Sequence, residues 1–198
     1  MISLFTREIK LQIRQPWVFI NAWLFFLFVI FLFGFLLSNL SFLLVMKAVV
    51  WIAMLFSYLL GIETLWYQES LSGCLELNML IPYPFTLIVF SKIITHWLLT
   101  SLPLALITLF ITKLLSFTLA IGLGGLALSA LGCLLSAVTL SCQTRGFLTA
   151  ILFIPLSMPI VILGSINTDA SIALLSALSL ICCMGCPLAT QGVLRMQA

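Results

Sequence analysis

Six long runs of apolar residues, separated by short polar interruptions, make up most of this chain. Of its 198 residues, 64% are hydrophobic and 7% are charged, whereas soluble domains average about half apolar and about a quarter charged residues. A helix needs about 20 apolar residues to cross a bilayer core about 30 Å thick. We therefore predict an all-α membrane protein in which residues 1–198 form one domain with six transmembrane helices. The predicted spans are Trp17–Leu37, Leu43–Ile62, Phe85–Thr112, Phe117–Leu140, Leu148–Ser165 and Ser171–Leu194.

Residues 1–16, ahead of the first span, have a different pattern. Basic residues recur there at helical spacing while apolar residues fall on another face, as in a helix that lies in the membrane interface. The basic residues are Arg7, Lys10 and Arg14, and the apolar ones are Phe5, Ile9 and Ile13. A secretory signal peptide is the competing interpretation, but the apolar run is too long and residues 38–41 offer no small-x-small cleavage site. We predict a retained interfacial helix.

Basic residues near the span ends predict the orientation, because cytoplasmic loops of membrane proteins carry an excess of Lys and Arg. With six spans, only Lys47 and Lys113 fall on one side of the membrane. The basic residues on the other side are Arg7, Lys10, Arg14, Lys92, Arg145 and Arg195. Both termini are therefore predicted to be cytoplasmic. The net charge of +3 is spread over several loops, which argues against nucleic acid as a partner.

The longest link between predicted spans, residues 64–84, would be cytoplasmic and carries concentrated acidic charge. A helix over Leu65–Leu80 would align an acidic stripe along one face. The residues of that stripe, spaced by four and three positions, are Glu69, Gly73 and Glu76. Pro82 and Pro84 cannot continue the helix and would end it in a stiff corner before the third span. The link is either a helix that docks on a partner or a solvated loop whose acids keep it in water.

The third predicted span contains three further polar or aromatic candidates. Lys92 lies near its cytoplasmic end, where its ammonium group could extend outward to water. His96, the only histidine, lies one turn deeper beside Trp97. A polar group at that depth needs a partner, so we expect His96 to face another helix, a cavity or a ligand. A hydrogen bond to another helix is the commoner solution, and ligation of a metal or haem iron is the alternative.

Cysteines and small residues mark two of the later spans. Cys183 and Cys186 form a CxxC pair, but Pro187 follows it, so the covalent haem signature C-x-x-C-H is absent. Apolar surroundings favour structural packing for these thiols over metal or redox chemistry. The glycines of the fourth span predict close helix packing or self-association. They are Gly122, Gly124, Gly125 and Gly132, accompanied by Ser129 and Ser136.

The sequence lacks several motifs that are typical of enzymes and of energy-coupled transporters. It contains no P-loop and no H-E-x-x-H, so it is a poor candidate for an enzyme acting alone. Its spans also lack the ladder of carboxylates expected of an ion-coupled carrier. If the chain transports a substrate, the energy is expected to come from another subunit.

Three blocks of residues resemble the CcmB haem exporter proteins, membrane subunits of the ABC-type system for cytochrome c maturation. The first block contains Trp51-x-Ala53-x-Leu55-x-Ser57, Glu63-x-Leu65, Gly73-x-Leu75-Glu76, Leu80-x-Pro82-x-Pro84, Lys92 and His96-Trp97 leading to Pro103. The second is Ile154-Pro155-Leu156-x-x-Pro159, and the third runs from Pro187-x-Ala189-Thr190 to Leu194-Arg195. The sequence departs from the family pattern in its short first external turn, its glycine-rich fourth span and its cysteine-bearing last span.

The resemblance implies an ABC-2 type permease in the bacterial inner membrane that pairs as a homodimer. Its expected partners are a cytoplasmic ATPase similar to CcmA, membrane proteins similar to CcmC and CcmD, the haem chaperone CcmE, and membrane lipids. No covalent cofactor or metal is expected; haem would be a substrate, and ATP would act only through the ATPase.

The resemblance also assigns roles to residues. The link between the second and third spans would be a coupling helix seated on the ATPase, with Glu63, Glu69, Gly73, Glu76, Pro82 and Pro84 in it. Lys92, His96 and Trp97 are candidates for the transport path or for proximity to haem.

Three functions remain open from the sequence. The first is a permease of cytochrome c maturation that either moves haem or drives the release of a haem-loaded chaperone. The second is an ABC-2 exporter of a lipid, glycan or drug without connection to haem. The third is a scaffold that uses no ATP and for which the acidic link is only a docking surface.

Overall fold

The computed structural model describes residues 2–14, 16–36, 42–75, 84–142 and 144–197, and all regular structure in them is helical. Six helices are long and apolar enough to cross a membrane. They are α2 (Pro16–Leu36), α3 (Phe42–Ile62), α6 (Phe85–Thr112), α7 (Leu115–Val138), α8 (Arg145–Ile166) and α9 (Asp169–Gln197). Their ends differ from the predicted spans by at most three residues. The predicted all-α, six-span fold is confirmed.

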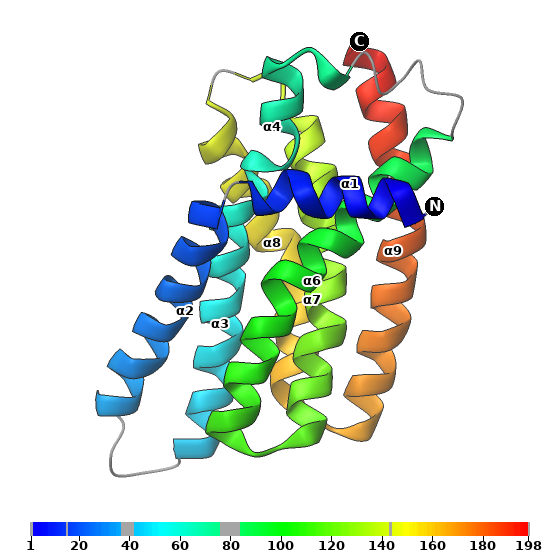
Figure 1. Ribbon diagram of the computed structural model, residues 1–198. Coiled ribbons are helices and arrows are strands. Elements are labelled where there is room, and N and C mark those ends of the chain that lie inside the picture. Colours follow the sequence, from blue (N-terminus) through cyan, green and yellow to red (C-terminus); the bar gives the residue numbers. More distant parts are fainter. Residues whose placement is uncertain (1, 15, 37–41, 76–83, 143, 198) are drawn as a thin grey trace.

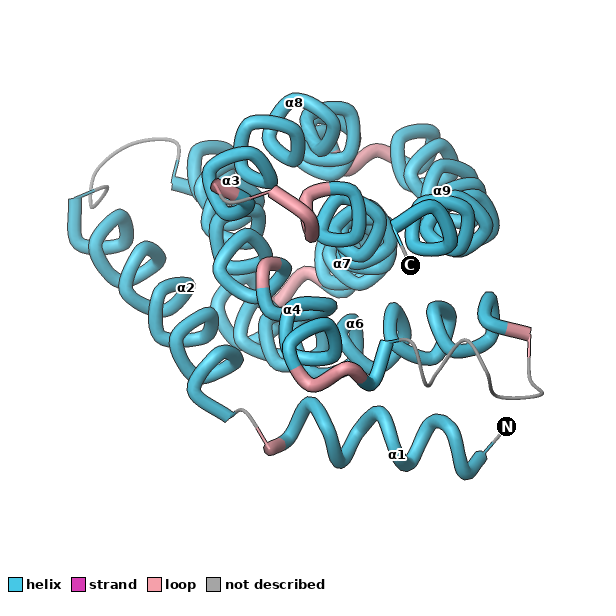
Figure 2. Tube along the Cα trace, turned by 90° about the horizontal axis from the view of Figure 1, so that it is seen from above, coloured by secondary structure: helices cyan, strands magenta, loops and turns pink. Residues whose placement is uncertain are grey.

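Helix α7 occupies the middle of the bundle (Figure 2). It packs against α3, α6, α8 and α9, and most of its residues are buried. The turns that connect α6 to α7 and α8 to α9 are short because each begins at a residue in the left-handed conformation, Lys113 at φ 53° and Asn167 at φ 52°. Such a residue ends a helix and reverses the chain within a few positions. Successive spans are therefore antiparallel neighbours.

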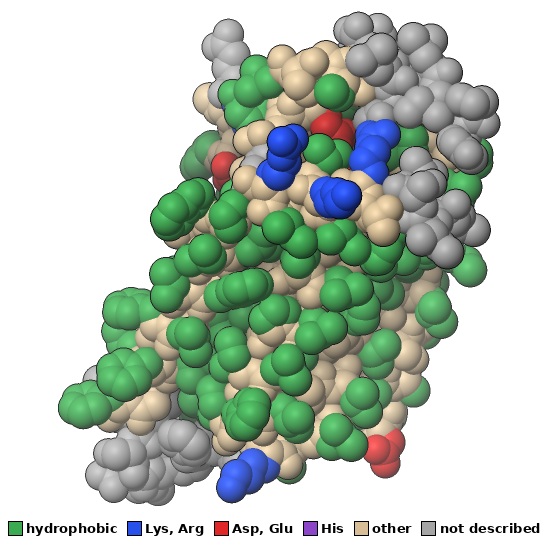
Figure 3. All heavy atoms as spheres, viewed as in Figure 1, with side chains coloured by type: hydrophobic (Ala, Val, Ile, Leu, Met, Phe, Trp, Pro, Cys, Tyr) green, Lys and Arg blue, Asp and Glu red, His purple; other side chains and the backbone are tan. Residues whose placement is uncertain are grey.

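In the described residues, two short helices lie at one end of the bundle. Helix α1 (Ile2–Ile13) runs across the spans, and α4 (Thr64–Leu71) follows α3 after the single residue Glu63 (Figure 1). Both chain ends point toward this end of the molecule. A broad belt of apolar side chains covers the spans, and basic side chains gather beside it at the level of α1 (Figure 3). This arrangement suits the predicted interfacial position of α1, because a polar and basic face at that level would meet water and headgroups.

The predicted continuous helix over Leu65–Leu80 is wrong. Helix α4 ends at Leu71, and Gly73 adopts φ 68°, a conformation that glycine enters without steric cost. Glu69 and Gly73 therefore do not align on one helical face. Glu76 and Pro82 lie outside the described residues, whereas Pro84 directly precedes α6 in an extended conformation.

Three of the four glycines of α7, Gly124, Gly125 and Gly132, serve helix packing, as the sequence indicates. The buried indole of Trp51 on α3 fills the space beside Gly124 of α7 and Gly164 of α8, where an added Cβ would lie 2.3 Å and 1.9 Å from ring atoms. Gly132 accommodates Ile62 in the same way. Gly122 is different because nothing lies within 4 Å of the position of its absent Cβ. Three helices thus meet around one tryptophan without a gap.

We expect Gly124→Ala to destabilise the protein by about 1–3 kcal/mol, the usual cost of overpacking a filled core. Gly122→Ala is the matched control on the same helix, and it should be neutral or slightly stabilising because alanine is the better helix former. Thermal unfolding of the purified chain in detergent measures both effects. Equal melting temperatures for the two variants would contradict the packing role of Trp51.

Candidate functional site

A buried lysine joins three helices at the end of the bundle that carries α1 and α4. The Nζ atom of Lys92, on α6, donates to the backbone carbonyl of Leu65 at 2.9 Å and to Glu69 Oε1 at 2.5 Å, both on α4. It also lies 4.0 Å from Glu8 Oε2 on α1 and 4.3 Å from the ring centre of Trp66. The Lys92 side chain is only 3% exposed. The expectation that its ammonium group extends outward to water is therefore wrong: Lys92 lies at the centre of an ion cluster.

Glu8 is the member of this cluster that the sequence analysis missed. It lies between basic residues on a helix expected to be amphipathic, and only its spacing from Gln12, one turn away, could have indicated an inward polar face. Gln12 Nε2 donates to the Lys92 carbonyl at 3.5 Å, so both side chains face α6. Burial raises the pKa of the Glu8 carboxyl above its usual range, and the Lys92 ammonium partly opposes that shift.

Helix α4 is anchored to the bundle by aromatic side chains as well as by Lys92. The buried Trp66 donates from Nε1 to the carbonyl of Cys133 on α7 at 3.1 Å, and its ring stacks on Phe85 at the start of α6 with 6.1 Å between centroids. The guanidinium of Arg145 lies 3.4 Å from the ring centre of Tyr67. The link segment therefore begins with a packed turn of helix, and the interpretation as a purely solvated loop fails for residues 64–71.

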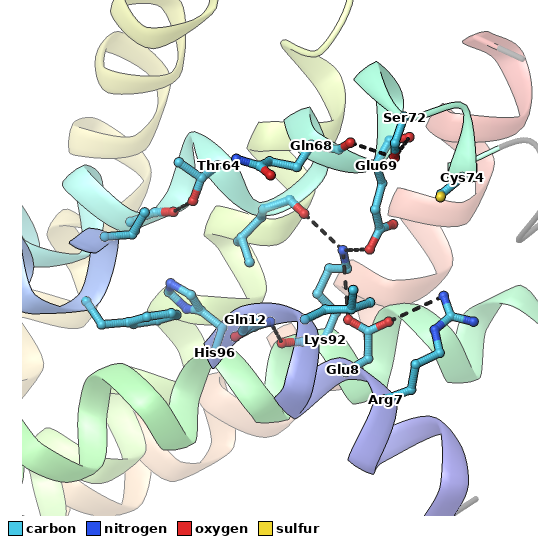
Figure 4. A pocket seen from close by; sticks show the side chains of 15 residues that line it. Arg7, Glu8, Gln12, Thr64, Gln68, Glu69, Ser72, Cys74, Lys92 and His96 are labelled. Atoms are coloured by element: carbon cyan, nitrogen blue, oxygen red, sulfur yellow. Dashed lines mark hydrogen bonds and ion pairs between the residues drawn. The ribbon is translucent and has the colours of Figure 1, made fainter. Parts of the chain in front are cut away.

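A cavity of about 650 Å³ opens between α1, α2, α3, α4 and α6. Figure 4 shows Glu8, Glu69 and Lys92 close together in its wall, with His96 at a distance from them. The polar and charged residues of the lining are Arg7, Glu8, Gln12, Thr64, Gln68, Glu69, Ser72, Lys92 and His96, and the apolar ones include Leu11, Val18, Phe19 and Leu65. The cavity is amphiphilic, with charge gathered around Lys92.

His96 lies where the cavity meets the core of the bundle. It is 1% exposed, and neither ring nitrogen has a hydrogen-bond partner among the described residues. Its ring instead contacts Tyr58 edge-on, with 5.5 Å between centroids, and approaches Phe19 at 6.2 Å. The expected hydrogen bond to a neighbouring helix is therefore absent from the described part of the chain. Of the three surroundings that the sequence left open for His96, another helix, a cavity or a ligand, the structure shows a cavity.

The remaining candidate residues are distributed differently. Trp97, half-buried, turns to α7 and donates from Nε1 to the carbonyl of Gly122 at 2.8 Å, and it does not line the cavity. Glu63 is exposed, and its carboxylate lies so close to Gly146 that a Cβ there would approach within 2.8 Å of Oε1. Gly146 is in the first turn of α8, where a carboxylate interacts favourably with the helix dipole. The structure thus brings Lys92, Glu69 and His96 to one cavity and leaves Trp97 and Glu63 outside it.

The chain is similar in sequence to known proteins over most of its length. The family model described as "CcmB protein" matches residues 1–196. A Pseudomonas aeruginosa protein named Heme exporter protein B is 34% identical over 179 residues, which cover 85% of this chain and 80% of the relative. Proteins with the same name from Haemophilus influenzae and Escherichia coli are 32% and 31% identical, covering 86% and 98% of this chain and 81% and 96% of those relatives.

Replacing Lys92 by methionine should destabilise the protein by about 3–5 kcal/mol, because it takes the buried cation away from two largely buried carboxylates and leaves only the more exposed Arg7, 3.9 Å from Glu8. Adding Glu69→Gln to Lys92→Met should recover part of the loss, since one of those charges is removed with it. Thermal unfolding in detergent is the measurement. Lys10→Met is the matched control, because Lys10 is exposed on α1 and surface substitutions usually stay within about 0.5 kcal/mol. Equal losses for Lys92→Met and Lys10→Met would contradict the cluster.

Proposed function

The chain belongs to the CcmB family, and from this membership we propose that it is the permease subunit of an ATP-driven complex for cytochrome c maturation. It is a membrane component of haem export, and its six spans make it a multi-pass bacterial membrane protein. In the proposal, ATP is hydrolysed by a separate cytoplasmic subunit similar to CcmA. The chain itself works as a homodimer beside proteins similar to CcmC and CcmD, with a chaperone similar to CcmE as acceptor.

The main support for the proposal is the connection that Lys92 makes between α4 and α6. In the bundle, α4 is the first segment after the second span, and it is joined to the third span by the bonds from Lys92 to Leu65 and Glu69. A displacement of α4 must either move α6 with it or break a buried ion pair, which is costly. The turn at Gly73 and the residues that lead to Pro84 complete the segment on which the ATPase would act. A movement of the ATPase would thus be transmitted to the third span through these side-chain contacts as well as through the backbone.

Orientation is part of the proposal. Arg7, Lys10 and Arg14 lie on or beside α1, at the end of the bundle that also carries α4 and both termini, and Lys113 lies at the opposite end, after α6. Because basic residues concentrate in the cytoplasm, we place α1, α4 and the termini on the cytoplasmic side of the bacterial inner membrane. The cavity then lies on the side from which an ATPase would act.

His96 is proposed as the residue nearest to haem if haem passes through this chain. Lys92 is already bonded to α4, and Trp97 is bonded to α7. Only His96 among the three candidates keeps ring nitrogens without a hydrogen bond in the described residues while lining the cavity. A neutral imidazole is a common metal ligand. Both modes of action, haem movement and release of a haem-loaded chaperone, are compatible with such a contact.

The first test is haem attachment in a strain that lacks this gene. The intact gene should restore covalently bound haem in membrane and periplasmic proteins. The same gene paired with a hydrolysis-dead ATPase should not restore it. Glu69→Gln should lower the haem attached per ATP hydrolysed about tenfold, within the range of ordinary coupling energies. Staining for haem and an ATPase assay of the purified complex give the two quantities.

Three controls accompany this test. Apocytochrome levels are measured in parallel, and the amount of chain in the membrane is compared by immunoblot. Asp169→Asn, an exposed position at the start of α9, should behave as wild type. Normal haem attachment in the deletion strain would refute the maturation role and favour an exporter unrelated to haem, whereas full function with the hydrolysis-dead ATPase would favour a scaffold.

His96→Leu should separate a structural role from a functional one. Leucine preserves most of the buried volume and removes two ring nitrogens that lack hydrogen bonds, so we expect the melting temperature to be unchanged or higher. Haem attachment should nevertheless fall, by about tenfold or more if the imidazole ligates iron. Wild-type haem attachment in a stable His96→Leu protein would show that the imidazole is not required.

A further inference from the structure

The charged end of the cavity has hydrogen-bond acceptors without donors. Glu8 Oε2, Glu69 Oε2 and Gln12 Oε1 are buried, and none of them has a hydrogen-bond partner among the described residues. All three side chains line the cavity, and Glu8 is only 2% exposed. Buried polar atoms in proteins are nearly always paired. These oxygens therefore indicate a donor that enters the cavity from outside the chain.

The charges of the cluster indicate what kind of donor this is. Lys92 is one cation between two carboxylates. Its Nζ is bonded to Glu69 Oε1 and to the carbonyl of Leu65, and it lies 4.0 Å from Glu8 Oε2, which is an ion-pair distance but too long for a hydrogen bond. Arg7 lies 3.9 Å from the other oxygen of Glu8, Oε1, and is itself part of the lining. A group with positive charge and N–H bonds would satisfy the two Oε2 atoms, whereas an anion would meet like charge there. In the described residues no group of three His, Cys, Asp or Glu side chains could hold a metal ion, which favours an organic cation.

The rest of the cavity indicates a molecule with an apolar part. Leu11, Val18, Phe19 and Leu65 form apolar lining beside the charged cluster. The volume of about 650 Å³ is typical of sites for small organic ligands and is more than an ammonium group needs. Four of the lining residues, Arg7, Glu8, Leu11 and Gln12, belong to α1, the helix that runs across the spans at the edge of the apolar belt (Figures 1 and 3). Lipid headgroups occupy that level of a membrane.

We propose that this cavity is a specific site for one phospholipid with a primary ammonium headgroup, phosphatidylethanolamine. Its ammonium donates hydrogen bonds to Glu8 Oε2 and Glu69 Oε2, and its phosphate lies on the side of Arg7. The glycerol and the first acyl carbons cover Leu11, Val18 and Phe19. A quaternary ammonium headgroup would bring charge without N–H donors, and a headgroup with net negative charge would meet two carboxylates. The site thus selects by hydrogen bonding as well as by charge.

Lipid competition measured by native mass spectrometry tests this proposal. The purified full chain is stripped of lipid in detergent and titrated with phosphatidylethanolamine, phosphatidylcholine and phosphatidylglycerol that carry identical acyl chains. We expect one molecule of phosphatidylethanolamine to bind about tenfold more tightly than either of the others, a difference of about 1.4 kcal/mol. Equal binding of the three lipids to the wild-type chain would overturn the proposal without any variant.

Two variants locate the site. Glu8→Gln keeps the size of the side chain but removes its charge, and it should abolish the preference for phosphatidylethanolamine. Asp169→Asn removes a carboxylate from an exposed position on α9 and should leave the preference unchanged. Circular dichroism and gel filtration show whether each variant is folded. Retention of the preference by folded Glu8→Gln protein would overturn the assignment of the site.

Two further arms distinguish a lipid from other amines. Glycerophosphoethanolamine has the same headgroup without acyl chains, so we expect it to compete weakly. Equally strong competition by this soluble compound would show that the site takes a small amine and would overturn the lipid assignment. If Glu8→Gln left lipid binding unchanged but prevented the ATPase from co-purifying, the cavity would be a protein contact and the lipid proposal would be wrong.

Discussion

A single buried ammonium group holds together the end of the bundle that differs most from a simple set of membrane spans. Removing a charge from water is costly, so Lys92 is stable at 3% exposure only because Glu69, Glu8 and the carbonyl of Leu65 surround it. Glu8 belongs to α1, and Glu69 and Leu65 belong to α4, so all three come from helices other than α6. The positions of α1 and α4 against α6 therefore depend on the same ammonium group, and Lys92 also lines the cavity between these helices.

The core of the bundle is held together by close packing of small residues rather than by charged groups. Membrane helices gain little from the hydrophobic effect when they associate, and small residues let them approach closely enough for dispersion forces to act. The contacts of Trp51 with Gly124 and Gly164 are of this kind. They pack α3, α7 and α8 closely against one another. Helix α2 lies at the edge, with Phe28, Phe31 and Phe35 exposed.

The spans could be predicted from the sequence because apolar length alone decides where a chain crosses a bilayer. Local patterns were less informative about the site. The spacing of Glu69 and Gly73 favoured one continuous helix, but Gly73 takes a left-handed conformation that ends it. The inward position of Lys92 depends on partners 23 and 84 positions away, Glu69 and Glu8, and such pairing leaves no periodic signal. The buried position of Glu8 could not be predicted for the same reason, because its neighbours in the sequence predict a surface helix.

Because Glu8 and Glu69 share one lysine, the cavity and the connection to α4 cannot be independent. A movement of α4 that withdrew Glu69 would leave Lys92 to Glu8 alone, and it would remove one of the two carboxylates from the charged end of the cavity, where Lys92 and Arg7 remain. An occupant held by the carboxylates would then bind more weakly, since its attraction to that end depends on the second negative charge. By linkage, an occupant that holds Glu8 and Glu69 together must in turn resist the movement of α4. The cluster of Lys92, Glu8 and Glu69 would thus connect α4, the third span and the content of the cavity.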